Sequence, residues 1–235
     1  MIQAIILDWA GTTVDFGSRA PVDVMCELMA AHGCPIDEAE ARVPMGLPKR
    51  DHIAAILALP RVQAAYRGPG LDELYADFLP RQTQVLDRYS TLLDGVVERV
   101  AAWQQAGIRI GTTTGYTRPM VDLLIARAAE QGYRPDVTFC PDDVGGGRPA
   151  PWMCFACLKA LGVYPAAHCV KIGDTPSDVA EGRNAGMWTI AVVDTGNEAG
   201  NPARLREAHY LAPSVAECGP LVEEIGRRIA AGERP

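Results

Sequence analysis

The sequence predicts an α/β protein with a Rossmann-like parallel sheet and an α-helical cap inserted after the first strand. Two observations predict this fold. Short apolar segments alternate with amphipathic helical segments over most of the chain, which is typical of parallel strands joined by helices. One long stretch, residues 18–89, is helical throughout and interrupts the alternation, so we interpret it as the cap. The core then comprises residues 1–17 and 90–235.

Five segments have the short apolar composition of buried parallel strands. The first, Ile2–Leu7, ends at Asp8 and is followed by a loop that begins at Gly11. The other four are residues 108–112, 137–140, 169–173 and 188–193.

Helical segments occupy the cap and the connections between the strands. In the cap, residues 22–31 have helical spacing and stop at Gly33, and Pro60 ends a later segment. The cap helices are predicted at residues 22–31, 37–42, 50–59 and 71–86. The core helices are predicted at residues 95–107, 119–132, 151–161 and 178–185.

Composition excludes several classes of protein. The 235 residues are 48% hydrophobic and 22% charged, as in globular domains. The net charge of 22 − 29 = −7 argues against nucleic-acid binding through a broad basic surface. No apolar run approaches the length of a membrane span, and the first residues do not resemble a signal peptide. Seven cysteines without regular spacing predict reduced thiols and a cytoplasmic protein.

Polar side chains follow the predicted strands at the edge where ligands bind in an open parallel sheet. In chain order they are Asp8, Thr114, Arg148, Asp174 and Asp178. Carboxylate oxygens suit Mg²⁺, whereas threonine and arginine suit phosphoryl oxygens. Each residue alone would more often be a helix cap, a turn residue or a solvated charge. Their combination predicts a phosphoryl site with Mg²⁺, in which an aspartate can act as the nucleophile.

These residues lie in motifs that resemble a known family. Residues 8–15, Thr114, Arg148 and residues 173–178 resemble the signature of the haloacid-dehalogenase superfamily of aspartyl-phosphate enzymes. Longer matches are similar to its phosphonoacetaldehyde hydrolases, at residues 45–52, 113–118, 141–144, 148–149, 151–154 and 181–188. The resemblance extends over residues 1 to about 197. It implies a haloacid-dehalogenase fold and a hydrolase that splits phosphonoacetaldehyde into acetaldehyde and phosphate.

The resemblance also implies a role for individual residues. Asp8 would be the nucleophile, and Lys49 would form an imine with the substrate aldehyde. Mg²⁺ would be held by Asp8, the carbonyl of Ala10 and Asp174, with Asp178 supporting them. The phosphoryl group would be held by Thr114, Gly115 and Arg148. Around the imine or its proton transfers would lie Met45, His52 and Tyr116. The family likeness further implies a homodimer acting on a small phosphonate, with no nucleic-acid or membrane partner.

Ala10 and Lys49 support this branch of the superfamily on chemical grounds. Phosphatases of the superfamily usually carry a second aspartate two residues after the nucleophile, and alanine cannot donate a proton to a leaving oxygen. A carbon leaving group needs an electron sink instead, and a lysine amine supplies one by forming an iminium. Only three of the 22 basic residues are lysines. For Lys159 we expect a solvated position, and for Lys171 no role beyond pairing with a local carboxylate.

Two other functions stay open at this point. One is a phosphomonoesterase or phosphomutase of the same superfamily, against which Ala10 and Lys49 argue. The other is a non-enzymatic phospho-acceptor module, which also uses aspartate, threonine and Mg²⁺ but does not suit the long helical insert.

The sequence departs from the family pattern in two places. The segment after residues 195–198 is shorter than expected before His209. Ser18-Arg19 stands where related enzymes can carry cysteine and an aromatic residue. Neither departure removes a proposed site residue.

Overall fold

A single six-stranded sheet forms the centre of the computed structural model, which describes all 235 residues. Its strand order is β3-β2-β1-β4-β5-β6, and every pairing is parallel. The strands are β1 (Ala4–Leu7), β2 (Arg109–Thr113), β3 (Val137–Phe139), β4 (Cys169–Gly173), β5 (Trp188–Val192) and β6 (Tyr210–Ala212). Because β1 and β4 are neighbours, the residues that follow them meet at one edge of the sheet.

Both faces of the sheet are covered by helices, which explains why the strands lack alternating polarity. Ile5 and Leu7 face the larger apolar core, whereas Ala4 and Ile6 face a smaller one. On the larger side lie α6 (Val96–Gln105), α7 (Arg118–Glu130) and α11 (Gly219–Ala230). On the other side lie α9 (Trp152–Leu161) and α10 (Pro176–Asn184). A single turn, α8 (Pro141–Val144), follows β3.

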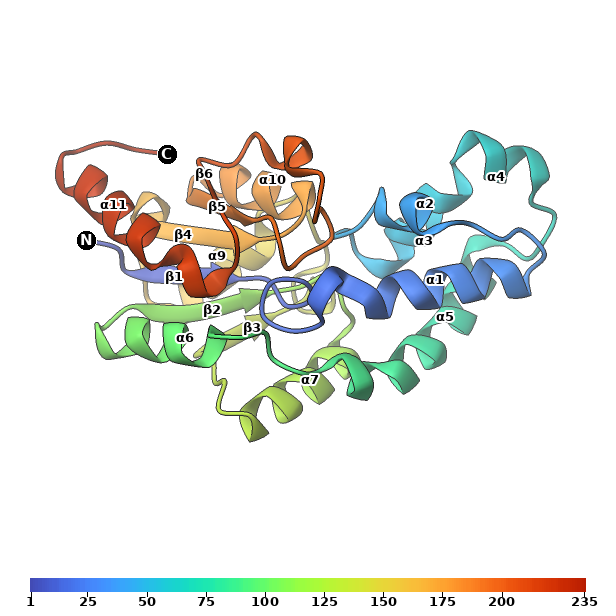
Figure 1. The fold of residues 1–235 in the computed structure, drawn as a ribbon, viewed down its shortest axis with the longest axis horizontal. Coiled ribbons are helices and arrows are strands. Elements are labelled where there is room, and N and C mark those ends of the chain that lie inside the picture. Colours follow the sequence, from blue (N-terminus) through green and yellow to red (C-terminus); the bar gives the residue numbers. More distant parts are fainter.

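The cap is a separate helical lobe beyond the carboxyl ends of the strands, and both chain termini lie at the opposite end of the molecule (Figure 1). Its helices are α1 (Arg19–Ala31), α2 (Glu38–Arg42), α3 (Lys49–Leu57), α4 (Pro60–Ala65) and α5 (Leu71–Leu86). Helices α1 and α3 both pack against α5, with Met25, Ile53 and Phe78 fully buried. The predicted fold class, a parallel α/β core with an inserted helical cap, is confirmed.

Apart from shifted ends, such as the start of α1 at Arg19, and the unpredicted single turn α8, the structure differs from the predicted elements in three places. The helix expected at residues 50–59 ends at Leu57, and Pro60 begins a new helix, because proline fits the first turn of a helix. Strand β6 was not predicted; it has only three residues, too few for a hydrophobic pattern. Helix α11 was also missed, although Val222, Ile225 and Ile229 lie on one buried face.

The cysteines and Lys159 agree with the sequence-based expectations. All seven thiols are free, and Cys154 and Cys157 are buried on α9 against the sheet. Lys159, on the same helix, is exposed. None of the helices combines the length and the hydrophobicity that a membrane crossing requires.

Candidate active site

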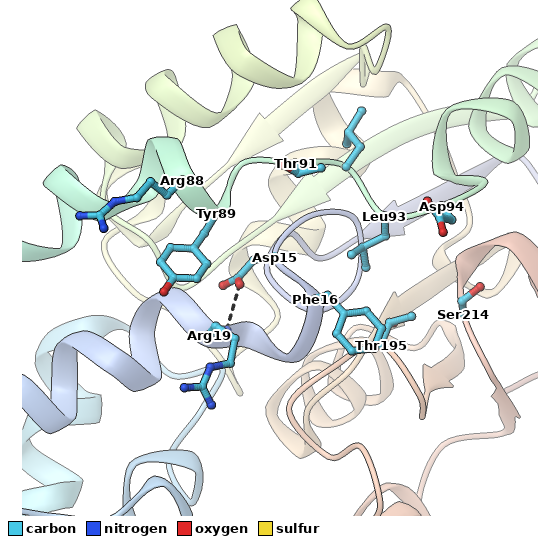
Figure 2. A pocket seen from close by; sticks show the side chains of 11 residues that line it. Asp15, Phe16, Arg19, Arg88, Tyr89, Thr91, Leu93, Asp94, Thr195 and Ser214 are labelled. Carbon is cyan, nitrogen blue, oxygen red and sulfur yellow. Dashed lines mark hydrogen bonds between the residues drawn. The ribbon is translucent and has the colours of Figure 1, made fainter.

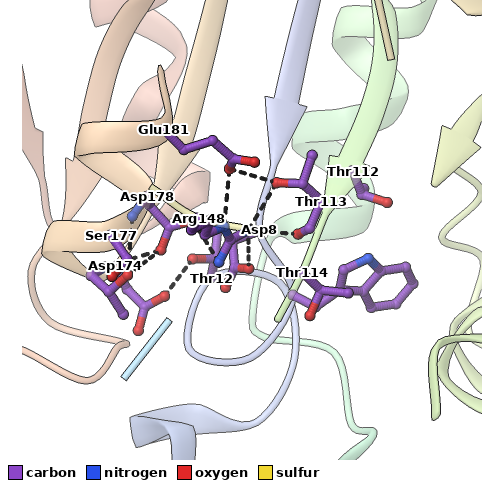
Figure 3. Close-up of polar contacts among 12 residues, drawn as sticks. Asp8, Thr12, Thr112, Thr113, Thr114, Arg148, Asp174, Ser177, Asp178 and Glu181 are labelled. Atoms are coloured by element: carbon purple, nitrogen blue, oxygen red, sulfur yellow. Dashed lines mark hydrogen bonds and ion pairs between the residues drawn. The ribbon is translucent and has the colours of Figure 1, made fainter. Parts of the chain in front are cut away.

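Three carboxylates gather where β1 and β4 end. Asp8 follows β1, Asp174 follows β4, and Asp178 lies in the first turn of α10, so that one oxygen of each falls within 4.8 Å of the others. Figure 3 shows these side chains converging beside Arg148. Arg148 Nη2 lies 2.7 Å from Asp8 Oδ1, and both side chains are buried. The sequence-predicted acidic residues are therefore brought together.

Asp174 is held by three hydrogen bonds from different loops. Thr12 Oγ1 donates to Oδ1 at 3.0 Å, while Ser18 Oγ and the Asn197 N–H donate to Oδ2 at 3.1 and 2.7 Å. Burial raises the pKa of Asp174 well above its usual range, and the negative charges of Asp8 and Asp178 raise it further. The carboxylate is fixed in place but lacks a positive partner.

Asp178 has the opposite surroundings. Its Oδ1 lies 2.8 Å from Lys171 Nζ and 3.0 Å from Arg148 Nη1, and its Oδ2 accepts from the hydroxyl of Thr175 at 2.6 Å. Burial would raise the pKa of Asp178, but Arg148 and Lys171 hold it below its usual value. With both oxygens already engaged, Asp178 fits a supporting position beside a metal better than direct coordination.

Arg148 is fixed from several sides at once. Its Nε donates to Glu181 Oε2 at 2.9 Å, and its Nη2 donates to the carbonyl oxygen and the hydroxyl of Thr113, both at 2.8 Å. Thr113 in turn donates to Glu181 Oε2 at 2.9 Å. Arg148 is only 3% exposed and still lines the cavity described below. It can therefore contact a bound group without changing its position.

Sequence reasoning did not assign Lys171, Glu181, Ser18 or Asn197 to this site. Lys171 lies in a strand in which every residue is buried, and a lysine in such a strand is a detectable signal for a buried ion pair. Glu181 lies one turn beyond Asp178 on α10, and its burial follows from that helix packing on the sheet. Ser18 and Asn197 reach the site from loops, which no periodic pattern marks.

The residues at this edge fit a divalent cation. Within the core, four buried carboxylates face two buried cations, Arg148 and Lys171, so these charges sum to −4 + 2 = −2 when all are ionised. Lys49 of the cap adds at most one positive charge beside them. The carboxylates are Asp8, Asp174, Asp178 and Glu181. Oxygen donors of this kind are those that Mg²⁺ prefers. The charge excess and the raised pKa of Asp174 both favour the binding of a divalent cation here.

A cap segment, residues 42–49, crosses the same edge of the sheet. Ser177 Oγ donates to the carbonyl oxygen of Met45 at 3.4 Å. A Cβ added to Gly115 would lie 2.5 Å from the Leu47 carbonyl oxygen, and one added to Gly147 would lie 2.5 Å from Pro48 Cγ. The glycine-rich connection before Arg148 thus allows the cap to approach closely. The segment ends at Lys49, which is the first residue of α3.

Lys49 and Asp8 line one small cavity between cap and core. Its volume is about 20 Å³. The other lining residues are Ala10, Ser18, Pro21, Met45, Gly46, Thr114, Gly115, Tyr116, Arg148 and Thr175. Lys49 Nζ lies 4.8 Å from the centre of the Tyr116 ring. Burial lowers the pKa of Lys49 to about 8, although nearby Asp8 works in the other direction.

His52 lies behind this cavity rather than in its lining. It follows Lys49 by one turn of α3 and is fully buried. Its Nε2 lies 2.8 Å from the carbonyl oxygen of Ala41, which can only accept, so Nε2 carries the proton. Burial and the Lys49 charge lower the pKa of His52 to about 3, which keeps the ring neutral. We expected His52 to act beside the imine. Its side chain instead points into the interior of the cap and does not line the cavity.

Comparison with known proteins identifies the family. The family model of haloacid dehalogenase-like hydrolases matches residues 2–186. The chain belongs to this family. Phosphonoacetaldehyde hydrolases of Bacillus thuringiensis (strain Al Hakam) and Bacillus anthracis are 46% and 41% identical to it over 257 aligned positions, covering 97% of each chain.

A solved structure agrees with these relatives. A phosphonoacetaldehyde hydrolase-like protein from Oleispira antarctica superposes with a TM-score of 0.95 and 36% identity, covering 100% of this chain and 96% of that one. The resemblance to the phosphonoacetaldehyde hydrolases that the sequence motifs indicate is therefore confirmed, as is the assignment to the hydrolases.

Proposed function

We propose that this haloacid dehalogenase-like hydrolase cleaves the carbon–phosphorus bond of phosphonoacetaldehyde to give acetaldehyde and phosphate. The observation that carries the proposal is the cavity in which Lys49 of the cap faces Asp8 of the core, with Ala10 in place of a proton donor. The relatives named phosphonoacetaldehyde hydrolase support the same substrate.

The reaction begins at Lys49. The neutral amine adds to the aldehyde carbon, and loss of water leaves an iminium. An Asp8 oxygen then attacks phosphorus while the carbon–phosphorus bond breaks and its electron pair enters the iminium, giving an enamine and an aspartyl-phosphate. Protonation of the enamine at carbon restores the imine. One water then releases acetaldehyde from Lys49, and a second releases phosphate from Asp8.

Arg148, Thr114 and Gly115 are proposed to hold the phosphoryl group, since all three line the cavity beside Asp8. Arg148 suits this role because its other hydrogen bonds already fix its orientation. Mg²⁺ would be held by Asp8, the Ala10 carbonyl and Asp174, with Asp178 supporting them. When bound, it would neutralise carboxylate charge beside the anionic substrate.

The residues around Lys49 are proposed to prepare its amine for the reaction. Tyr116 places its ring against Nζ, and Met45 excludes water from the cavity wall. His52 packs behind Lys49, and its ring stays neutral. It therefore adds no positive charge beside the Lys49 amine. We therefore assign His52 a positioning role on α3. Groups that line the cavity, and not His52, would transfer protons to and from the amine.

Residues 18–89 are proposed to move as a cap. The cavity of about 20 Å³ has room for about one water molecule, which is too little for the substrate. Substrate therefore enters only when the cap lifts from the core, and reclosing brings Lys49 to the aldehyde.

We also propose that the enzyme acts as a homodimer in the cytoplasm. Trp152 and Phe155 are 53% and 41% exposed on α9 and form an edge-to-face pair, which offers an apolar surface to a second copy. The free thiols suit a reducing compartment. Sedimentation of the wild type and of Trp152→Glu tests the dimer: a wild-type protein that sediments as a monomer would contradict it.

The function is tested by assaying phosphate and acetaldehyde release from phosphonoacetaldehyde beside phosphate release from simple phosphate monoesters. The account expects equal amounts of the two products and little turnover of the esters. Asp8→Asn should abolish phosphate release. Faster turnover of the esters than of the phosphonate would instead favour a phosphatase.

A further inference from the structure

The cap and the core share a second polar contact away from the cavity that holds Lys49. Arg42, the last residue of α2, donates from Nη1 to the Gly17 carbonyl oxygen at 2.8 Å and to Asn197 Oδ1 at 3.2 Å. Asn197 Nδ2 donates back to the carbonyl oxygen of Arg42 at 3.2 Å. Arg42 and Asn197 therefore exchange hydrogen bonds across the boundary between cap and core.

Asn197 is joined to the acidic cluster as well. Its backbone N–H donates to Asp174 Oδ2 at 2.7 Å, and the residue is 5% exposed. The preceding residue, Gly196, packs so closely that a Cβ added there would overlap the Asp174 side chain. The loop that carries Asn197 thus has little freedom to move without moving the Asp174 carboxylate.

A neighbouring ion pair strengthens the same contact. Arg204 Nη1 lies 2.7 Å from Glu198 Oε1, and Arg204 Nη2 donates to the carbonyl oxygen of Val43 at 3.2 Å. Asn197 Nδ2 also donates to Glu198 Oε1 at 2.9 Å. The segment after β5 therefore forms hydrogen bonds with two successive cap residues, Arg42 and Val43.

We propose that Asn197 is a positioning residue that couples closure of the cap to placement of the Asp174 carboxylate. The proposal rests on the proposed function, because it takes Lys49 as the group that the closed cap delivers. Closure forms the two hydrogen bonds between Asn197 and Arg42, and these hold the backbone N–H against Asp174. Lys49 and Asp174 thus reach their working positions in the same movement. Asn197 lines no part of the cavity and touches no reacting atom.

The test compares Arg42→Ala, Asn197→Ala and the double variant with the wild type. Arg61→Ala is the matched control, because Arg61 pairs with Glu40 inside the cap and makes no contact with the core. The measurement is the rate at which borohydride fixes substrate on Lys49 at low substrate concentration. Each single variant should slow trapping roughly three- to tenfold, the range expected from the lost hydrogen bonds. The double variant should lose less than the product of the two single losses, because both single variants remove the hydrogen bond from Arg42 Nη1 to Asn197 Oδ1.

The pH dependence of trapping separates a loosened cap from a generally weakened protein. Lys49 has a pKa of about 8 because the closed cap buries it, next to Asp8, Asp15, Asp174 and Arg148. Arg42→Ala and Asn197→Ala should move the pH of half-maximal trapping upward, and Arg61→Ala should not. Arg42→Lys, which keeps the charge but lacks the planar fork, should fall between wild type and Arg42→Ala.

Trapping rates like that of Arg61→Ala in both single variants would overturn the proposal, as would losses that multiply in the double variant. If Asn197→Ala does not fold, only Arg42→Ala and Arg42→Lys are compared with the wild type. Arg42 lies at the edge of the cap, so its replacement should not prevent folding. If the wild type itself gives no adduct on Lys49, the proposed function fails. If the wild type gives the adduct and the variants match it, only the coupling fails.

Discussion

Lys49 lies in surroundings that change what its amine can do. In water a lysine amine is almost fully protonated at neutral pH. Burial between cap and core lowers the pKa of Lys49 to about 8, so a substantial fraction is the neutral nucleophile near physiological pH. Arginine at this position would stay charged and could not form the imine.

This pKa predicts how the activity depends on pH. Below about pH 8 Lys49 is mainly the cation and cannot attack the aldehyde; above it the neutral amine predominates. kcat/KM should therefore rise as pH increases through about 8 and then level off. The measurement is kcat/KM for phosphonoacetaldehyde from about pH 6 to about pH 10, with roughly one tenfold step per pH unit on the rising limb. A profile that falls over this interval would contradict the assignment.

Replacing the amine tests the same claim by mutation. Lys49→Arg should reduce turnover of phosphonoacetaldehyde on the order of a thousandfold or more, because the covalent step is lost. The matched control is Lys159→Arg, which changes an exposed lysine on α9 and should leave kcat and KM unchanged. Substantial activity in Lys49→Arg would remove the imine from the mechanism.

Local chemistry in the sequence predicts the site only in part. Ala10 and Lys49 are informative because each changes which leaving group the enzyme can serve. Lys171 and Glu181 were not assigned because their partners come together only when β4 and α10 pack side by side. The direction of the His52 ring depends on the tertiary packing of α3, which no local pattern encodes.

At the scale of elements, the cap segment 42–49 and the glycines beneath it determine how closely Lys49 approaches the core. The backbone of Gly115 does not have a positive φ, so other residues could adopt its conformation. Glycine is needed there only because a side chain would not fit. A Cβ at this position would meet the carbonyl oxygen of Leu47 at 2.5 Å, and backbone cannot easily give way.

Gly115→Ala should therefore hold the cap away from the core. The expected loss of kcat/KM is roughly a hundredfold, as for a displacement of a catalytic group by about 1 Å. Gly226→Ala is the control: it lies in α11 with nothing within 4 Å of an added Cβ, and alanine there should stabilise the fold by about 0.5–1 kcal/mol. Unchanged kcat/KM in Gly115→Ala would show that closure does not need this approach.

The alternation of apolar strands and amphipathic helices was sufficient to predict most elements of the core. Cys169–Gly173 and Leu71–Leu86 have the predicted bounds because loops or breaking residues flank a clear pattern. Three-residue β6 depends on pairing with β5 rather than on its own sequence, so pattern analysis could not detect it. The start of a helix at Pro60 shows that proline can begin a helix as well as end one.

In the core beneath the cap, four buried carboxylates outnumber Arg148 and Lys171, which leaves an excess of negative charge there. A separate pocket of about 430 Å³ lies at the two cap–core connections. Figure 2 shows Asp15 and Tyr89 on one side of it and Thr195 and Ser214 on the other. This pocket is larger than the cavity that holds Lys49, but it lacks Asp8 and Lys49. We attribute its space to the junction between cap and core.

Metal removal tests the charge balance. Mg²⁺ at about a hundred times its Kd should stabilise the folded protein by about 2.7 kcal/mol, or roughly 5–10 °C in Tm for a chain of this size. Asp174→Asn should lose most of this shift, because it removes the charge of one carboxylate in the acidic group that could hold the ion. Thermal unfolding with Mg²⁺ and with chelator measures it, and identical Tm values in the two conditions would argue against a resident divalent cation.

The account depends most on a covalent bond between Lys49 and the substrate. The decisive measurement is incubation with phosphonoacetaldehyde and borohydride, followed by peptide mapping by mass spectrometry. With only three lysines in the chain, the site of the adduct can be assigned without ambiguity. The imine mechanism requires a reduced adduct on Lys49 alone, including in Asp8→Asn, where imine formation precedes the blocked step. An unmodified Lys49 in an enzyme that still releases phosphate from phosphonoacetaldehyde would contradict it.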